Sequence, residues 1–325
     1  MIISKTPLRI EFTGGSDLPA FYHQEPGAIV NVTINKYIFV SVRNPNFYTN
    51  NPFYIDCGRV DDVKSVHQIK DTLIRLTLRY KKAKELSLSS FSDLPTQTGL
   101  GSSGSFLVGL LHVLSNMNGK ICTPMELAKD AFYVEGHLAK VNCGPQDQMA
   151  AALGGLRLHE FLPDDSLKSK VVKCSPQTFK TLEENLLLFY TGNQRSSHNL
   201  LDNLSKTLTE SAKARGLMSQ RVKLSHQMAK EIHANSLTNF GEMLDEDWRL
   251  KKEIAPIETN DVINSIYTKA IRAGASGGKL VGAGGQGFML FYAPKDRHEK
   301  IQKALKTLKS FDVAFTHSGS QIIQS

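Results

Sequence analysis

The chain of 325 residues has little of what marks secreted, membrane-bound or metal-rich proteins. It has only four cysteines, which follow neither metal-ligand spacing nor disulfide-framework density, so we expect reduced, buried thiols. No apolar run approaches the ~18 residues of a membrane span, and the N-terminus lacks the long apolar core of a signal peptide. These absences predict a cytoplasmic protein that has no membrane partner.

The sequence also lacks any concentration of charge of one sign. Lys and Arg number 39 against 31 Asp and Glu, a net charge of +8, but the basic residues are scattered and form only short clusters such as residues 81–84. No basic stripe with interleaved aromatic residues occurs, so nucleic acid is not an expected partner. The positive balance favours the steering of phosphate-bearing small molecules. The length and the 41% hydrophobic content predict a large core and two domains.

Glycine and hydroxyl residues gather in one stretch, PTQTGLGSSGS at residues 95–105. Apolar residues spaced by three and four follow from Phe106 to Leu114, so the stretch opens a helix. A helix start presents unpaired N–H groups and a positive dipole end, and glycine lets a polyanion approach the backbone. A serine-capped helix after a flexible turn is the structural alternative. The length and order of the loop favour phosphate binding.

Two common phosphate-loop patterns fit this stretch poorly. Gly99-x-Gly101-x-x-Gly104 matches the dinucleotide fingerprint as text, but the polar approach, which is interrupted by Pro95, lacks the required buried strand. The P-loop pattern needs a lysine that Ser105 does not supply.

Two carboxylates, Glu135 and Asp147, are candidates for chemistry. Glu135 falls on the otherwise apolar face of a helix that starts at Thr123-Pro124, where it needs either a cationic partner or a metal ion. Asp147 falls in the first turn of a short helix. An acid there is ordinary dipole compensation, or one member of a pair that handles a metal and a proton.

The N-terminal half predicts strands before its first long helix. Apolar and polar residues alternate over residues 8–12, which predicts a half-buried strand with one polar face. The strand ends at a double glycine that is followed by Asp17. Asp17 is either a ligand contact or part of an Asx-turn. Residues 29–34 and 37–42 predict a hairpin turning at Asn35-Lys36. Further predictions are strands at 53–56 and 86–91 and a helix at 63–84. This order favours a mixed α+β class over a doubly wound parallel sheet.

The C-terminal half predicts a strand at 186–190, which ends in a polar loop with Arg195, either an anion contact or a solvated arginine. Helices are predicted at 200–234, 237–254 and 261–274, and Trp248 is expected to be partial core. The glycine-dense segment 277–287 predicts a tight turn between two strands, set either by hairpin geometry or by close passage of a ligand. A helix at 295–309 and a strand at 311–315 are expected to complete the chain.

Three motifs resemble the GHMP kinases, the family of galacto-, homoserine-, mevalonate and phosphomevalonate kinases. They are Pro7-Leu8-Arg9-Ile10 with its glycine turn, the Pro-x-x-x-Gly-Leu-Gly-Ser-Ser stretch, and Lys279-Leu280-x-Gly-Ala-Gly-Gly-x-Gly. The first continues as Phe12-Thr13-Gly14-Gly15-Ser16-Asp17, which, with Thr191-Gly192 and the nearby Arg195, is similar to the branch of D-glycero-D-manno-heptose 7-phosphate kinases and bacterial-type fucokinase domains. Gly104 stands where relatives often have Ala, a change expected to spare phosphate binding.

The resemblance implies an α+β, two-domain GHMP kinase architecture. Residues 1–180 would form a domain like ribosomal protein S5 domain 2, and residues 181–325 a ferredoxin-like domain, with ATP and Mg²⁺ at their junction. Ser103 and Glu135 would hold Mg²⁺, while Asp147 would accept a proton beside Arg9. The expected nucleotide contacts are Pro95, Gly99, Leu100, Gly101, Ser102, Ser103, Gly104, Gly284 and Gly285. The expected substrate contacts are Ser16, Asp17, Arg195 and Lys279.

The expected activity is phosphorylation of the anomeric hydroxyl of a heptose 7-phosphate, for activated-heptose synthesis. A sugar phosphate accounts for the positive balance and for Arg195 and Lys36, which are expected near the cleft. A kinase for a neutral sugar such as fucose stays open, as does a non-catalytic sugar sensor, against which Glu135 and Asp147 both argue. The oligomeric state is also open, with a homodimer as one option.

Overall fold

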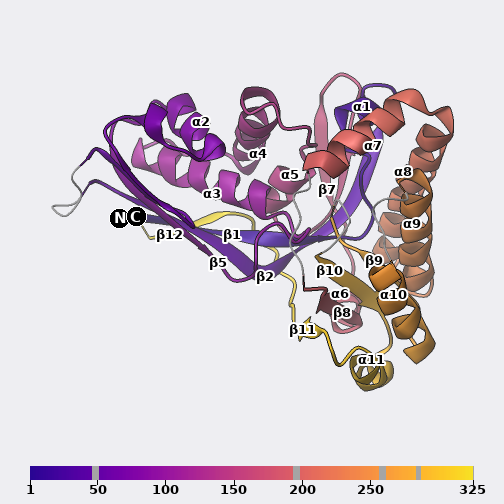
Figure 1. Ribbon diagram of the computed structural model, residues 1–325. Helices are drawn as coiled ribbons and strands as arrows, with labels where there is room; N and C mark the ends of the chain where they lie inside the picture. Colours follow the sequence, from indigo (N-terminus) through magenta and orange to yellow (C-terminus); the bar gives the residue numbers. More distant parts are fainter. Residues whose placement is uncertain (46–50, 193–197, 256–260, 283–286, 325) are drawn as a thin grey trace.

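The protein combines two β-sheets with helices (Figure 1), so the predicted α+β class is confirmed. The computed structural model describes residues 1–45, 51–192, 198–255, 261–282 and 287–324. Within these residues the larger sheet has the order β12-β1-β2-β5-β3-β4, with β6 on β2 and β7 on β6. Its strands are β1 (Ile2–Glu11), β2 (Gly27–Arg43), β3 (Phe53–Asp56), β4 (Val60–Val63), β5 (Leu86–Ser92), β6 (Leu156–Phe161), β7 (Leu167–Val171) and β12 (Gln321–Gln324).

The smaller sheet belongs to the C-terminal half of the chain. Its order is β11-β8-β10-β9, and its strands are β8 (Leu186–Tyr190), β9 (Gly277–Leu280), β10 (Phe288–Tyr292) and β11 (Lys309–Phe311). The strand predicted at 311–315 therefore lies earlier in the chain, as β11. Within 312–315 only Phe315 forms a β-type contact, an isolated bridge to Ile34. β9 and β10 pair antiparallel, so two strands do flank the predicted glycine turn. Gly277–Leu280 of the predicted turn segment form β9, and residues 283–286 lie outside the described residues.

The predicted hairpin at Asn35-Lys36 is wrong, because β2 runs through both residues as one strand. The pairing with β1 passes from Leu8 opposite Ile34 to Pro7 opposite Tyr37, so Asn35 and Lys36 form a bulge. The Asn35 N–H donates to the Ala314 carbonyl at 2.7 Å, and Asn35 Oδ1 accepts from the Ala314 N–H at 2.9 Å. The C-terminal segment therefore satisfies the polar groups that a turn would have left to solvent.

Helices of the N-terminal half gather on one face of the larger sheet (Figure 1). They are α2 (Thr72–Tyr80), α3 (Ser102–Met117), α4 (Pro124–Phe132) and α5 (Gln146–Leu153), and α3 packs on both β1 and β2. The predicted helix at 63–84 begins late, because Asp71 is its N-cap: Asp71 Oδ1 accepts from the Ile74 N–H at 2.9 Å. The residues before it form β4 and a 3₁₀ turn at Val66–Gln68.

In the described residues, the C-terminal half has four long helices. They are α7 (His198–Glu210), α8 (Ala212–His233), α9 (Phe240–Ile254) and α10 (Asp261–Ala273). The predicted helix at 200–234 is divided because Ser211 caps α8 through the Ala214 N–H at 3.2 Å. Shorter helices are α1 (Pro19–Tyr22), α6 (Pro176–Glu184) and α11 (His298–Ala304), the last shorter than the predicted 295–309.

One hydrophobic core joins the two halves. Phe12, which directly follows β1, meets Phe240 of α9 edge to face, with ring centroids 5.1 Å apart, and Phe288 of β10 belongs to the same cluster. β12 returns to the larger sheet and pairs with β1. The division at residue 180 stays a prediction. Trp248 is buried, as expected for a core residue, and none of the helices described has the length and apolarity to cross a membrane.

Candidate active site

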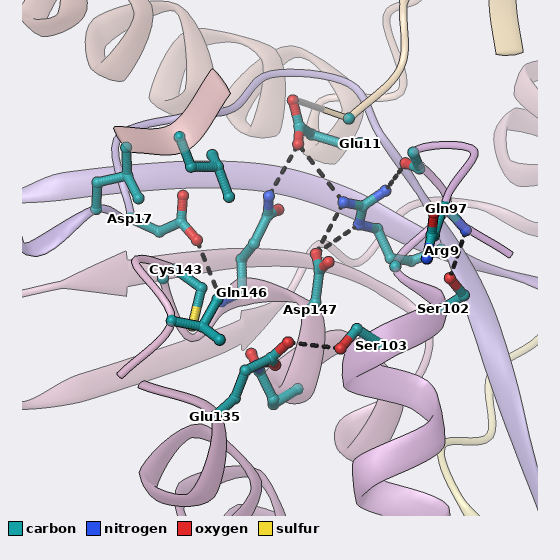
Figure 2. Close-up of a pocket in the computed structure, with 18 of the residues that line it drawn as sticks. Arg9, Glu11, Asp17, Gln97, Ser102, Ser103, Glu135, Cys143, Gln146 and Asp147 are labelled. Atoms are coloured by element: carbon teal, nitrogen blue, oxygen red, sulfur yellow. Dashed lines mark hydrogen bonds and ion pairs between the residues drawn. The ribbon is translucent and has the colours of Figure 1, made fainter. Parts of the chain in front are cut away.

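A cavity of about 600 Å³ opens beside β1, the stretch 95–105 and α5, and Figure 2 shows the side chains in it. This volume suits a small-molecule site. Arg9 and Asp17 line it from the N-terminal segment, Glu135 and Asp147 from the helical region, and Lys251 from α9. The structure therefore brings together the two carboxylates and the glycine- and serine-rich loop that the sequence singled out separately.

The stretch 95–105 forms a loop that leads into the N-terminus of α3. Gly99 and Gly101 have φ of +89° and +76°, a left-handed conformation that favours glycine. Gly101 is the N-cap of α3, and no side chain caps this helix start. The Ser102 hydroxyl accepts from the Gln97 N–H at 3.2 Å, so it holds the loop. The structural alternative, a serine-capped helix, does not fit this arrangement, which suits an anion instead.

The two glycine-rich segments touch each other through their backbones. A Cβ on Gly99 would lie 2.3 Å from the Val281 carbonyl oxygen, and one on Gly282 would lie 2.4 Å from the Gly99 Cα. A Cβ on Gly287 would lie 2.3 Å from the Thr98 carbonyl oxygen. Such contacts leave no room for a side chain, so glycine is required here. Gly284 and Gly285 lie outside the described residues.

Asp147 and Arg9 form an ion pair on the cavity wall (Figure 2). Arg9 Nε and Nη2 lie 2.9 and 2.8 Å from Asp147 Oδ1, and Arg9 Nη1 donates to the Gly99 carbonyl. Burial alone would lower the pKa of Arg9, but the carboxylates of Asp147 and Glu11 raise it above its ordinary value. Arg9 is therefore a permanent cation that links the loop to the carboxylate in the first turn of α5.

Gly104 sets the distance between α3 and α5. A Cβ at this position would lie 2.7 Å from the Asp147 Cβ and 2.9 Å from the Gln148 backbone nitrogen. The backbone of α5 would have to move to accept it. An alanine at position 104 would thus change the position of Asp147.

Glu135 is buried on a π-helical turn, Tyr133–Leu138, that follows α4. The Ser103 hydroxyl donates to Oε1 at 2.5 Å, and the Gln148 amide donates to Oε2 at 2.6 Å. Burial raises the pKa of Glu135, the two hydrogen bonds oppose this shift, and the charge of Asp147 adds to it. Among the described residues, no cationic side chain forms a salt bridge with Glu135, which leaves the metal-ligand alternative.

The oxygen atoms of Ser103 and Glu135 fit Mg²⁺ in kind. Magnesium takes oxygen ligands, and protein sites commonly supply one or two carboxylates while substrate phosphates supply the rest. In the described part of the chain, no group of three or more His, Cys, Asp or Glu side chains could hold a metal by itself. A metal here would depend on a phosphorylated ligand.

Asp17 lies on the cavity wall without a cationic partner of its own in the described residues. It is 5% exposed, and the backbone N–H of Gln146 is 3.4 Å from Oδ2. Burial, together with the charges of Asp147 and Glu11, raises the pKa of Asp17 to about 7. It does not cap α1, whose start has no side-chain cap. Its carboxyl group is thus placed to bind a ligand.

Two predicted substrate contacts point into the protein instead of the cavity. The Ser16 hydroxyl donates to the Ala28 carbonyl at 2.9 Å and accepts from its N–H at 3.0 Å. Lys279 is fully buried, and its ammonium group donates to Asp247 Oδ2 at 2.6 Å, to the Phe12 carbonyl at 3.0 Å and to Glu11 Oε1 at 3.3 Å. Both side chains are already occupied, so a direct substrate contact does not fit them.

Of the two other basic residues predicted near the cleft, the structure describes only Lys36. Lys36 lies at the bulge of β2 and is not among the described residues that line the cavity. Arg195 lies outside the described residues, so its predicted contact stays a prediction.

Sequence reasoning missed a chain of buried ion pairs behind the cavity, which we call the charge ladder; its members are Arg221, Asp247, Lys279 and Glu11. Arg221 Nε and Nη2 bind the two oxygens of Asp247 at 2.8 and 3.0 Å, and Lys279 links Asp247 to Glu11. Burial would raise the pKa of Asp247, but Arg221 and Lys279 lower it to about 2. A sequence signal existed for Glu11, because Glu11 shares the polar face of β1 with Arg9. We find no such signal for Asp247.

Glutamines on both sides of Asp147 were also missed. Gln146 donates to Glu11 Oε2 at 2.8 Å, and Gln148 donates to Glu135. Both line the cavity. The triplet Gln-Asp-Gln at a helix start was the only signal, and it did not distinguish polar contacts from ordinary solvent exposure.

Comparison with known proteins identifies the family of this chain. The chain matches the GHMP kinases N terminal domain over residues 67–155 and the GHMP kinases C terminal domain over residues 228–310, together more than half of its length. It is 27% identical to a D-glycero-alpha-D-manno-heptose 7-phosphate kinase of Campylobacter jejuni, over 98% of this chain and 97% of that one. A galactokinase of Pyrococcus furiosus is 24% identical over 94% of this chain and 92% of its own.

The fold agrees as well. The crystal structure of a D-glycero-D-manno-heptose 1-phosphate kinase from Bacteroides thetaiotaomicron superposes with a TM-score of 0.81 at 22% identity, covering 100% of this chain and 99% of that one. Both family domains, the loop at the start of α3 and the paired carboxylates lead to one conclusion. The chain belongs to the GHMP kinase family, and it is an ATP-dependent kinase.

Proposed function

We propose that this kinase transfers the γ-phosphoryl group of ATP to the anomeric hydroxyl of D-glycero-D-manno-heptose 7-phosphate, giving the 1,7-bisphosphate. The observation that carries the reaction is the Arg9–Asp147 pair, 2.8 Å apart, beside the uncapped start of α3. The Campylobacter jejuni relative supports the substrate. Besides Arg9, three basic residues on the cavity wall, Arg59, Lys70 and Lys251, also favour an acceptor that carries a phosphate over a neutral sugar.

The triphosphate would bind at the first turn of α3. Backbone N–H groups at residues 101–103 and the positive end of the helix favour an anion there. A hydrogen bond from β1 holds the loop in position, because the Arg9 N–H donates to the Leu100 carbonyl at 3.0 Å. Pro95 is the first residue of the loop and is exposed, and its carbonyl accepts from the Thr98 hydroxyl at 2.8 Å.

Ser103 and Glu135 are the residues that would hold Mg²⁺. The ion would neutralise charge on the phosphate oxygens when bound. Glu135 is kept in place by Gln148, so the side chain is already directed to the loop before any ligand binds.

Asp147 would accept the proton of the attacking hydroxyl. Both contacts with Arg9 are made by Oδ1, so we assign Oδ2 as the proton acceptor. Arg9 would stabilise negative charge that develops on the transferring group, since it also contacts the Gly99 carbonyl of the loop. Asp17 would bind hydroxyl groups of the sugar, and Leu201 and Leu204 of α7 line the apolar part of the cavity.

ADP release measured with a panel of acceptors tests this function. The panel holds heptose 7-phosphate, heptose 1-phosphate, unphosphorylated heptose, fucose, galactose and mevalonate, each with ATP and Mg²⁺. We expect the highest kcat/KM with heptose 7-phosphate and a new phosphate ester at C1 by ³¹P NMR. A higher kcat/KM with a neutral sugar would replace the substrate and keep the kinase, and phosphorylation at another carbon would overturn the assigned position.

A further inference from the structure

Gln146 has an amide oxygen with an unused hydrogen-bonding capacity on the cavity wall. The residue is 8% exposed and lines the cavity directly before Asp147. Its Nε2 donates to Glu11 Oε2 at 2.8 Å. Its Oε1 is buried and has no hydrogen-bond partner among the described residues. Figure 2 shows Gln146 with Asp17 and Asp147 around the same space.

Glu11 fixes which end of the Gln146 amide is left without a partner. Lys279 Nζ lies 3.3 Å from Glu11 Oε1, and Arg9 Nη2 lies 3.9 Å from Oε2, so the carboxyl group is held as an anion. An ionised carboxylate only accepts hydrogen bonds. The amide nitrogen must therefore face Glu11, and turning the amide over would place two acceptors against each other. The oxygen is left on the other side.

A buried acceptor without a donor is unfavourable, so this oxygen needs a donor. The oxygen is buried in the free protein, so a donor reaches it only when the side chains around it shift as a ligand binds. No described residue supplies that donor, so the ligand is the candidate donor in the complex. The neighbouring Asp17 and Asp147 are carboxylates, which in ionised form supply acceptors only. The combination suits a polyhydroxylated ligand.

We propose that Gln146 Oε1 accepts a hydrogen bond from a sugar hydroxyl that neighbours the one facing Asp147, and that Gln146 thereby selects the acceptor sugar. The inference deepens the proposed function and rests on the acceptor being a sugar. It makes Gln146 a specificity-determining residue, oriented by Glu11. Lys279, which the sequence suggested as a ligand contact, serves here by keeping Glu11 charged.

The test compares kcat/KM of the wild type and a variant with the full substrate and with substrate analogues, in the manner of a double-mutant cycle. Gln146→Met keeps the length of the side chain and removes both polar groups. With the full substrate we expect kcat/KM to fall about 10- to 100-fold, from the usual cost of an unpaired polar group, with KM for ATP unchanged. Analogues that each lack one hydroxyl other than the reacting one are then measured with both proteins. For the analogue that lacks the partner hydroxyl, the variant and the wild type should have the same kcat/KM.

Several outcomes would overturn the inference. If Gln146→Met lowers kcat/KM by the same factor for every analogue, the residue acts through the structure and not through a hydroxyl. If the full substrate shows no change, the oxygen has no ligand partner. Gln177→Met is the matched control, because Gln177 is an exposed glutamine on α6 that bonds only Thr181 in the described residues; we expect no change in any kinetic constant.

A second variant keeps the test valid if Gln146→Met folds poorly. Glu11→Gln removes the charge that orients the Gln146 amide. The ratio of kcat/KM for the full substrate to kcat/KM for the analogue that lacks the partner hydroxyl should therefore decrease. Undiminished discrimination would contradict the orienting role. If the acceptor panel identifies a neutral sugar, the heptose 7-phosphate assignment fails, while the same cycle run with deoxy derivatives of that sugar still tests Gln146.

Discussion

Two buried aspartates, Asp17 on the cavity wall and Asp247 behind it, behave in opposite ways. Asp247 of α9 is fully buried between Arg221 and Lys279, and these two cations lower its pKa to about 2. Asp17 is 5% exposed, its charged neighbours are Asp147 and Glu11, and its pKa is raised to about 7. Burial penalises the charged form of both, so the sign of the neighbouring charges decides the outcome.

The comparison separates structural from functional charges. On the C-terminal side, Arg221, Asp247 and Lys279 satisfy one another and join α8, α9 and β9 to β1. On the N-terminal side, Asp17 and Glu135 have no salt bridge to a cation among the described residues, and both have raised pKa values. Carboxylates left in this state are typical of functional sites.

The largest expected effect is on the reaction. Asp147→Asn removes the proposed proton acceptor, so kcat should fall by about 10²- to 10⁴-fold while ATP binding, measured by calorimetry, is retained. Asp164→Asn is the matched control, because Asp164 is an exposed aspartate in the turn between β6 and β7. A kcat within a factor of two of wild type for Asp147→Asn would contradict the assigned role.

The next effect is on stability and concerns the charge ladder. Lys279→Met leaves the buried carboxylates of Glu11 and Asp247 without their shared cation, which should cost about 3–5 kcal/mol of unfolding free energy. Urea denaturation measures this cost. The control is Lys303→Met, whose exposed pair with Glu299 should leave the midpoint unchanged. Equal midpoints for the two variants would show that the ladder is not structural.

A smaller loss is expected from Gly104→Ala. The added Cβ would lie 2.7 Å from the Asp147 Cβ, so α3 and α5 must separate, at a cost of about 1–3 kcal/mol. A lower kcat should accompany this loss, since Asp147 moves. Gly216→Ala on α8 has no neighbour within 4 Å and should be neutral or slightly stabilising. If Gly104→Ala also behaves as neutral, the two helices are not fixed by this contact.

The smallest effect concerns the shape of a pH profile. Folded Asp17 keeps its proton to about pH 7, whereas an unfolded aspartate loses it near its ordinary pKa of 3.8. The unfolded state therefore binds fewer protons in this window, and stability contributed by the neutral group declines as pH rises from about 4 to about 7. Asp17→Asn should remove this decline. Identical pH slopes of the unfolding free energy in both proteins would refute the raised pKa.

Local sequence patterns predicted the elements that are defined by neighbours along the chain. The capping pattern at Thr123-Pro124 located the start of α4, and the apolar spacing after Gly104 located α3. Predictions failed where distant segments decide. Asn35-Lys36 forms a bulge because Ala314 satisfies Asn35, and the residues before Asp71 form β4 because β3 pairs with them. Neither partner is visible from local composition.

The same division holds in the site. Motif and helix position placed Arg9, Asp147, Glu135 and the loop glycines in one predicted site. In the structure Arg9, Asp147 and Glu135 line one cavity with Gly99 and Gly101. Lys279 was misplaced, because a lysine beside a glycine-rich turn gives no sign that Asp247 and Glu11 will enclose it. Gln146 was overlooked, since its importance depends on which end of the amide Glu11 binds.

A crystal structure with Mg²⁺, a non-hydrolysable ATP analogue and heptose 7-phosphate tests the central claim most directly. The account predicts the terminal phosphate against the backbone N–H groups at the start of α3, the ion at Ser103 and Glu135, and the anomeric hydroxyl within hydrogen-bond distance of Asp147. A triphosphate bound away from α3, or a sugar whose reacting hydroxyl lies out of reach of Asp147, would contradict it.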